Sequence, residues 1–271
     1  MVEKDGIIIK DGQIILNSGE KLSIENLIEE ARRIRFIRNQ HFKDTSIRIL
    51  ESSRVVFENC IFDNVLFENC DLREISFKNH TVIRNCTFKR CNLNGTFFSD
   101  SRILSSTFLS CQMKRPLLEN VSEMRDCLFK KCRMHDIFFP LPEFQYNKII
   151  GKLSECTFGS KTKNLEKLYA DLSEAHLTFV DFLRCDLTDT ICPEDPDILY
   201  INNLSERAKK AQEKIATIQD DTKRRTLSIY IESWTNEKYV DYLLSRKDCQ
   251  WSWEEAFEDV AKCLELDWGL D

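Results

Sequence analysis

The feature that most constrains the fold of this chain is an apolar residue at every fifth position along its middle part. Seventeen such positions follow one another in three phases, and each change of phase adds one residue. A helix repeats its buried face every 3.6 residues and a strand every two, so this period requires a chain that turns a corner after each short extended piece. The seventeen residues are Phe57, Phe62, Phe67, Leu72, Phe77, Val82, Phe88, Leu93, Phe98, Ile103, Phe108, Met113, Leu118, Met124, Phe129, Met134 and Phe139.

The position two residues before each of these is small or medium in size, and it is often cysteine. If four five-residue pieces make one square coil, the cysteines at 70, 91, 111 and 132 lie on one wall of successive coils. Parallel side chains in such a ladder do not converge in a tetrahedron, so we expect buried packing, with metal binding or redox chemistry as the alternative. His80 occupies one of these inward positions beside a change of phase, and we expect it to turn outward or to be satisfied at a bulge.

Several of the pentapeptides combine a small residue, then Asp or Asn, then Leu. The best examples are Cys70-Asp71-Leu72, Cys91-Asn92-Leu93, Ala170-Asp171-Leu172 and Cys185-Asp186-Leu187. In these the chain resembles the pentapeptide-repeat family over roughly residues 55–192, although it favours Cys over Ala and often lacks the Asp or Asn. The resemblance implies a mainly β solenoid, a right-handed four-sided β-helix, whose open ends must be capped or paired.

The rest of the chain divides into two caps and two interruptions of the repeat. Residues 1–50 predict an N-terminal cap, with a hairpin that turns at Asp11-Gly12 and a helix from Ser23 to about Arg38. Residues 51–195 form the repeat region, with loop excursions near 140–153 and 159–169. Residues 196–271 predict an α-helical C-terminal cap or small domain of four helices, the third carrying Tyr239, Val240, Leu243 and Leu244.

Four aromatic residues are the candidates for binding a partner. Phe144 and Tyr146 lie in the first predicted excursion, and loops that leave a rigid scaffold often carry function. Trp251 and Trp253 lie in the C-terminal region, and tryptophan is enriched at protein interfaces. The alternatives are that the excursion folds back on the coil as a local plug and that the tryptophans form the core of the helical cap.

Composition and charge exclude several classes of function. No apolar run is long enough to cross a membrane and the chain opens without a leader, so we expect a cytoplasmic protein with reduced thiols, despite twelve cysteines. The net charge is −6, and residues 55–139 carry twelve Lys and Arg against ten Asp and Glu, which does not suit a nucleic-acid binder. We find no motif for catalysis, for a metal or for a cofactor, and therefore expect no enzyme activity.

The function predicted from the sequence is a protein-interaction scaffold or adaptor, a subunit of a larger complex. Its partner is another protein, and a homodimer through the C-terminal helices is the alternative assembly. The family resemblance implies two other roles: a DNA-mimicking binder of a topoisomerase such as gyrase, and a bacterial effector that acts in a host cell. DNA mimicry requires a strongly acidic solenoid, whereas the repeat region of this chain is nearly neutral.

Overall fold

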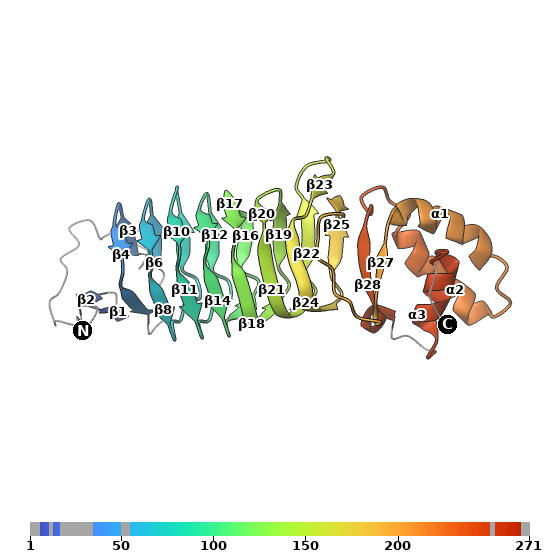
Figure 1. The fold of residues 1–271 in the computed structure, drawn as a ribbon, viewed down its shortest axis with the longest axis horizontal. Helices are drawn as coiled ribbons and strands as arrows, with labels where there is room; N and C mark the ends of the chain where they lie inside the picture. Colours follow the sequence, from blue (N-terminus) through green and yellow to red (C-terminus); the bar gives the residue numbers. More distant parts are fainter. Residues whose placement is uncertain (1–5, 11–12, 17–34, 50–54, 250–252, 267–271) are drawn as a thin grey trace.

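The computed structural model describes residues 6–10, 13–16, 35–49, 55–249 and 253–266. These residues form a long column of stacked coils, with a helical region at its C-terminal end (Figure 1). The column has about seven coils, and its strands pair in parallel register with strands twenty or twenty-one residues away, as Phe57 with Phe77 and Phe77 with Phe98. This confirms the four-sided β-helix. Within the described residues, no helix is long and apolar enough to cross a membrane.

Each coil has four sides, and each side contributes to one sheet along the column. The first side contains β3 Arg35–Arg38, β6 Val55–Glu58, β9 Ser76–Lys78, β12 Phe97–Ser99 and β16 Leu117–Asn120, followed by the sheet of β19 Phe138–Leu141, β22 Thr157–Ser160 and β25 Asp181–Leu183. The second contains β4 His41–Lys43, β7 Ile61–Asp63, β10 Val82–Arg84, β13 Arg102–Leu104, β17 Glu123–Arg125 and β20 Phe144–Gln145, and the pair β23 Glu166–Lys167 and β26 Cys185–Asp186 follows.

The longest sheet covers the third side and part of the fourth. It contains β5 Ser46–Ile49, β8 Leu66–Glu68, β11 Thr87–Lys89, β14 Thr107–Leu109, β18 Leu128–His135, β21 Asn147–Ser154 and β24 Ala170–Thr178, and β15 Gln112–Lys114 pairs with β18. The hairpin of β1 Gly6–Lys10 and β2 Gln13–Leu16 extends this sheet, because β1 pairs with β5. The hairpin was predicted from the sequence, and its two turn residues lie outside the described ranges.

The chain turns its corners with residues in the left-handed region of φ. Asn59, Asn64 and Asn69 have φ of 50°, 55° and 53°, and the same conformation recurs about every five residues along the column. This region is unfavourable for most L-residues but is tolerated by Asn and Asp, which explains why asparagine precedes so many of the inward positions. The corner residue, rather than the strand, therefore sets the period of five.

Aromatic stacking fills the interior of the column. The rings of Phe67, Phe88, Phe108 and Phe129 lie above one another on the third side, with centroid separations of 4.5, 4.8 and 4.8 Å. All four are fully buried. Each ring therefore loses contact with water and gains two ring partners, and a buried aromatic pair adds about 0.5–1.5 kcal/mol beyond the area it buries.

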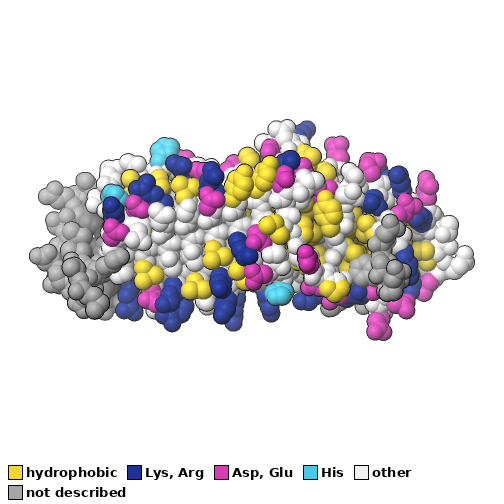
Figure 2. All heavy atoms as spheres, viewed as in Figure 1, with side chains coloured by type: hydrophobic (Ala, Val, Ile, Leu, Met, Phe, Trp, Pro, Cys, Tyr) yellow, Lys and Arg dark blue, Asp and Glu magenta, His cyan; other side chains and the backbone are white. Residues whose placement is uncertain are grey.

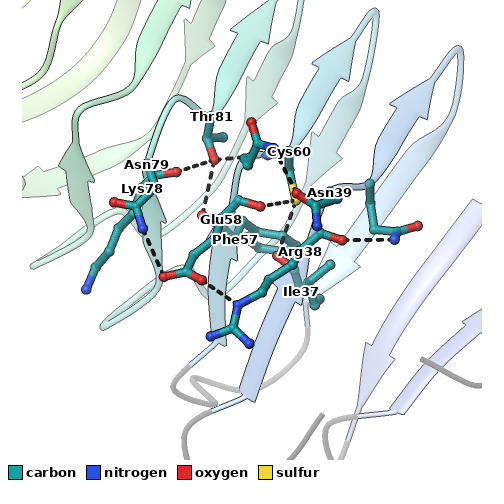
Figure 3. A network of polar contacts seen from close by, with 11 residues as sticks. Ile37, Arg38, Asn39, Phe57, Glu58, Cys60, Lys78, Asn79 and Thr81 are labelled. Atoms are coloured by element: carbon teal, nitrogen blue, oxygen red, sulfur yellow. Dashed lines mark hydrogen bonds and ion pairs between the residues drawn. The ribbon is translucent and has the colours of Figure 1, made fainter. Parts of the chain in front are cut away.

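The small inward positions connect neighbouring coils by hydrogen bonds. The Cys60 thiol lies 3.2 Å from the carbonyl oxygen of Ile37, and the Thr81 hydroxyl lies 3.2 Å from that of Phe57 (Figure 3). Cysteine, threonine and serine fit here because each is narrow enough for the interior and carries a donor. This gives the cysteine-rich wall a hydrogen-bonding role in addition to the packing expected from the sequence.

The first change of phase lies one corner earlier than the sequence predicted. Asn79 and His80 both adopt left-handed φ, so the additional residue is accommodated at the corner. Thr81 and Ile83 then point inward and are fully buried, whereas Val82 faces outward. The His80 side chain is exposed, with Nδ1 3.1 Å from Asp100 Oδ2, so the outward orientation expected for this histidine is correct.

The coils begin earlier than residue 51, and the first predicted loop is wrong. Arg35–Arg38 form strand β3 of the first coil, so the predicted helix does not extend to Arg38, and residues 17–34 lie outside the description. In the region expected to leave the column at 140–153, Phe144 and Ile149 point inward at five-residue spacing from Phe139. The two prolines are accommodated at β19 and the turn after it, so the coil continues. Residues 161–165 do leave the strands, near the predicted second excursion (Figure 1).

The C-terminal region contains helices and one strand pair. Its elements are β27 Ile198–Ile201, α1 Leu204–Ile215, α2 Asp221–Ser233, β28 Tyr242–Ser245, a 3₁₀ turn Arg246–Cys249 and α3 Ala256–Cys263. The apolar stripe at 239–244 was predicted as a helix, but β28 is a strand that pairs antiparallel with β27. A short apolar run fits either structure, and here a partner strand decided the outcome.

We predict that Phe108→Ala destabilises the protein by about 3–5 kcal/mol, because it removes the middle ring of a stack and leaves a cavity in a closely packed interior. Thr107→Ala, which alters an outward residue of the same strand, is the matched control and should change stability by less than about 0.5 kcal/mol. Denaturant unfolding followed by circular dichroism measures both. Equal effects of the two substitutions would contradict the stacked core.

Candidate interaction face

One side of the column carries apolar side chains on its outer surface. Phe108 of β14, Phe129 of β18 and Ile149 of β21 are buried and lie in one register row, so the residues on either side of each point outward. Leu109, Lys130 and Ile150 lie next to one another in register, and Leu128 and Lys148 form the adjacent row. We call the outer surface made by these five residues the candidate face. Its three aliphatic side chains are half-buried.

A rigid aromatic group forms one border of the candidate face. Tyr146 occupies the corner before β21 with φ of 56° and is 55% exposed. Its ring stacks on Tyr169 with centroids 5.2 Å apart and an interplanar angle of 20°, and the Arg125 guanidinium lies 5.5 Å from its centroid. We call Arg125, Tyr146 and Tyr169 the tyrosine edge.

Hydrogen bonds from the neighbouring glutamine fix the tyrosine edge. Gln145 Nε2 donates to the Lys167 carbonyl oxygen at 2.9 Å, and Gln145 Oε1 accepts from the Tyr169 backbone N–H at 2.9 Å. A large aromatic residue with positive φ is uncommon and is kept only when its surroundings impose that conformation. The exposed ring is therefore held in place before any partner arrives.

Positive charge forms the opposite border. Strand β18 turns a corner at Lys131, so Lys130 lies on the candidate face and Arg133 on the next side of the column. Lys152 is the register partner of Arg133, and Lys114 lies in the strand on its other side. We call Lys114, Lys130, Lys131, Arg133 and Lys152 the basic edge. Figure 2 shows Lys and Arg side chains along the lower border of the coils.

The carboxylates closest to the basic edge are bound to other cations. Asp136 pairs with Arg115, whose hydrogen bond holds the pKa of that carboxyl below its usual value. Asp171 and Glu174 both contact Lys148, with N–O distances of 2.8 and 3.0 Å. Within the described ranges, no ion pair joins any residue of the basic edge to an acid.

The four residues predicted to bind a partner have different fates. Phe144 is fully buried between Phe139 and Phe158, so the prediction for this residue is wrong. Tyr146 is exposed and belongs to the tyrosine edge. Trp251 lies outside the described residues. Trp253 is half-buried in the C-terminal region, and its Nε1 donates to Asp259 Oδ2 at 2.8 Å.

A pocket of about 380 Å³ lies beside Trp253, between the three C-terminal helices. Its lining is apolar at Ile218 and Leu227, and Lys223 contacts both Asp259 at 3.2 Å and the Trp253 ring at 5.5 Å. The remaining lining residues are Lys214, Asp259, Lys262 and Cys263. Lys214 also pairs with Glu265, so the lysines of this pocket are largely matched by acids.

The cysteines do not form a reactive site. Eleven of the twelve thiols are buried, and Cys192 is half-buried. Burial raises the pKa of Cys86 and Cys156 to about 11 and that of Cys127 to about 12, so these thiols stay protonated and poorly nucleophilic at neutral pH. In the part of the chain that the structure describes, no three His, Cys, Asp or Glu side chains are grouped to hold a metal.

Sequence reasoning missed the basic edge and most of the tyrosine edge. Lys114 and Lys152 lie nineteen residues on either side of Arg133 in the sequence, so only the coil register brings them together. The coil length of about twenty residues was available from the five-residue period and could have revealed the cluster. Tyr169 could not have been aligned with Tyr146 in this way, because residues 161–165 interrupt the period.

No protein-family model matches the chain, and no curated protein is similar to it in sequence. Among solved structures it is similar to full-length QnrB1, a plasmid-mediated fluoroquinolone resistance protein, with 11% identity over 59% of this chain and 87% of QnrB1 and a TM-score of 0.30.

Two other similar structures come from cyanobacteria. Rfr23, a pentapeptide-repeat protein from Cyanothece 51142, has 8% identity over 58% of this chain and 87% of its own, with a TM-score of 0.21. HetL from Nostoc sp. strain PCC 7120, a pentapeptide-repeat protein involved in heterocyst differentiation regulation, has 12% identity over 60% and 90%, with a TM-score of 0.20. These values are low, and the pentapeptide-repeat fold of this chain follows from its own coil registers.

We predict that stability falls as the pH rises above 9, because burial raises the pKa of the Cys86 and Cys127 thiols in the folded chain above the ordinary value of 9.0. Their contribution is fully present below pH 9 and is lost between about pH 9 and pH 12, as the unfolded chain gains thiolates that the folded chain excludes. The measurement is the midpoint temperature of thermal unfolding, compared between about pH 7.5 and about pH 10.5.

The control is the double variant Cys86→Ser and Cys127→Ser. Serine does not titrate in this range, and Ser106 already occupies the same row between these two positions, where its hydroxyl donates to the Leu104 carbonyl oxygen. Between the two pH values, the midpoint temperature of the variant should fall by fewer degrees than that of the unaltered protein. An identical loss would show that the buried thiols do not contribute.

Proposed function

We propose that this protein is a non-enzymatic scaffold that binds another protein through the candidate face. The observation that carries the proposal is the juxtaposition of half-buried Leu109, Leu128 and Ile150 with the tyrosine edge on one border and the basic edge on the other. An apolar centre with a polar border is the usual anatomy of a protein interface. Tyrosine and arginine are among the residues most often found at energetic hot spots.

The rigidity of the column supports this proposal. The candidate face lies on strands that pair on both sides, and its side chains stand on a stacked aromatic interior. A surface that is already ordered loses little conformational entropy when it binds, and so more of the contact energy is available as affinity. The reducing cytoplasm expected from the sequence is also the compartment in which twelve free thiols persist.

Two alternatives receive less support from the described surface. Phe97 and Leu117 are register partners on the first side and are 42% and 38% exposed, but in the part of the chain that the structure describes no stacked aromatic pair like Tyr146 and Tyr169 adjoins them. A DNA mimic would present acidic residues along the column, whereas the basic edge places five cations there without acidic partners in the described residues.

We predict that Ile150→Lys reduces capture of the partner at least tenfold, because it places a charge in the apolar centre of the candidate face. Tagged protein purified from its native cell, with quantitative mass spectrometry of what accompanies it, is the measurement. Ile61→Lys is the matched control, since Ile61 is an exposed isoleucine on the second side of the column. Equal capture by both variants would contradict the proposal, and a doubled mass for the pure protein would identify a second copy as the partner.

A further inference from the structure

We infer that the basic edge recognises an acidic segment of the partner protein, in which carboxylates alternate with apolar side chains. This inference rests on the proposed function and specifies the chemistry of the partner. The five cations of the basic edge lie on three neighbouring coils, in β15, β18, β21 and the corner of β18. Neighbouring strands are about 4.8 Å apart, so the cluster is compact enough for one short segment to contact all of it.

The basic edge is unfavourable for the protein alone. Arg133 and Lys152 are direct register partners, and like charges opposite each other on neighbouring strands destabilise a sheet. The nearby carboxylates do not relieve this repulsion, since Asp136 pairs with Arg115 and both Asp171 and Glu174 contact Lys148. Glu155 lies 3.9 Å from His135. An anionic partner would replace the repulsion with ion pairs.

The corner at Lys131 adds a second, backbone argument. Its φ is 57°, in the left-handed region that lysine adopts less readily than asparagine. The equivalent corners one, two and three coils earlier have Ser110, Arg90 and Asn69, with φ of 55°, 55° and 53°. Lysine at this corner therefore brings a conformational cost but adds an exposed charge between Lys130 and Arg133.

The surroundings favour an acidic protein segment over a nucleic acid. Leu109, Leu128 and Ile150 lie directly beside the cations, and apolar side chains of a partner can contact them. Toward the N-terminal end, Glu68 and Asp71 on the same two sides are paired with Lys89, Arg90 and Arg73; toward the C-terminal end, Asp171 and Glu174 are the register partners of Lys148 and Ile150. A polyanion that continued along the column past β21 would meet Asp171 and Glu174, so the cluster suits a ligand that ends at β21 better than a long duplex.

The test uses a fluorescent twelve-residue peptide of alternating Glu and Leu, a Lys and Leu peptide of the same length, and a duplex DNA of twenty base pairs. Binding of each to the full chain is followed by fluorescence anisotropy at several salt concentrations. We expect saturable binding of the Glu and Leu peptide that weakens as salt rises. The triple variant Lys130→Glu, Lys131→Glu and Arg133→Glu should weaken this binding at least tenfold.

The matched control is Lys43→Glu, Lys161→Glu and Lys163→Glu, which changes the net charge equally at exposed lysines elsewhere and should alter binding less than threefold. If the first triple variant does not fold, Lys130→Gln, Lys131→Asn and Arg133→Gln removes the charges without reversing them, and asparagine suits the corner. Equal weakening by both sets, or no saturable binding of the Glu and Leu peptide, would overturn the inference. Tighter binding of the DNA would show a nucleic-acid surface instead and would also overturn it.

Partner capture separates this inference from the proposed function. If Ile150→Lys abolishes capture and the basic-edge variant does not, the scaffold proposal stands and the acidic partner is excluded. If neither variant reduces capture, the candidate face is not the binding surface and both proposals fail. Loss of capture with both variants, together with the peptide result above, supports the inference.

Discussion

The structure depends on one backbone constraint: a left-handed residue at the corner of most five-residue pieces. Because Asn59, Asn64 and Asn69 adopt this conformation in succession, the chain closes a square coil in about twenty residues. The coil length then places Phe67, Phe88, Phe108 and Phe129 above one another, and the ring stack holds the coils in register. An additional residue is tolerated when it is inserted at a corner, as at Asn79 and His80. The inward-pointing residues before and after that corner then stay in register with those of the neighbouring coils.

Because the coils are narrow and their interior is filled, binding must use the side chains on the outer surface. The interior is only as wide as a phenylalanine and a small residue, and the thiols that line it hydrogen-bond to carbonyl oxygens of the preceding coil. Burial raises the pKa of Cys60, Cys86 and Cys127, which suppresses thiolate chemistry at these positions. The outer residues of each strand, by contrast, form rows of side chains about 4.8 Å apart, so that substitutions in successive coils build a continuous surface. The candidate face and its two edges are built in this way.

Much of the fold could be predicted from the sequence, because the period of five is local and repeats many times. The errors occurred where local composition concealed the period: Pro140 and Pro142 suggested a loop, although Phe144 and Ile149 keep the spacing. The strand at 242–245 was mistaken for a helix because its partner, β27, is some forty residues away. For the site, Tyr146 was predicted to bind a partner from a loop excursion, whereas it is an exposed residue at a corner of a coil. Predicting the basic edge required aligning the residues of three coils with one another. The five-residue period gave the coil length, but this alignment was not made from the sequence.

The central claim is that a partner binds on the outer surface of β14, β18 and β21. The most direct test is a photo-crosslinking amino acid placed at Leu128, in the centre of the candidate face, and compared with the same amino acid at Phe97 on the first side of the column. After irradiation of living cells, the account predicts a covalent adduct of one discrete mass from position 128 and little or none from position 97. An adduct from position 97 alone, or the same adducts from both positions, would contradict it.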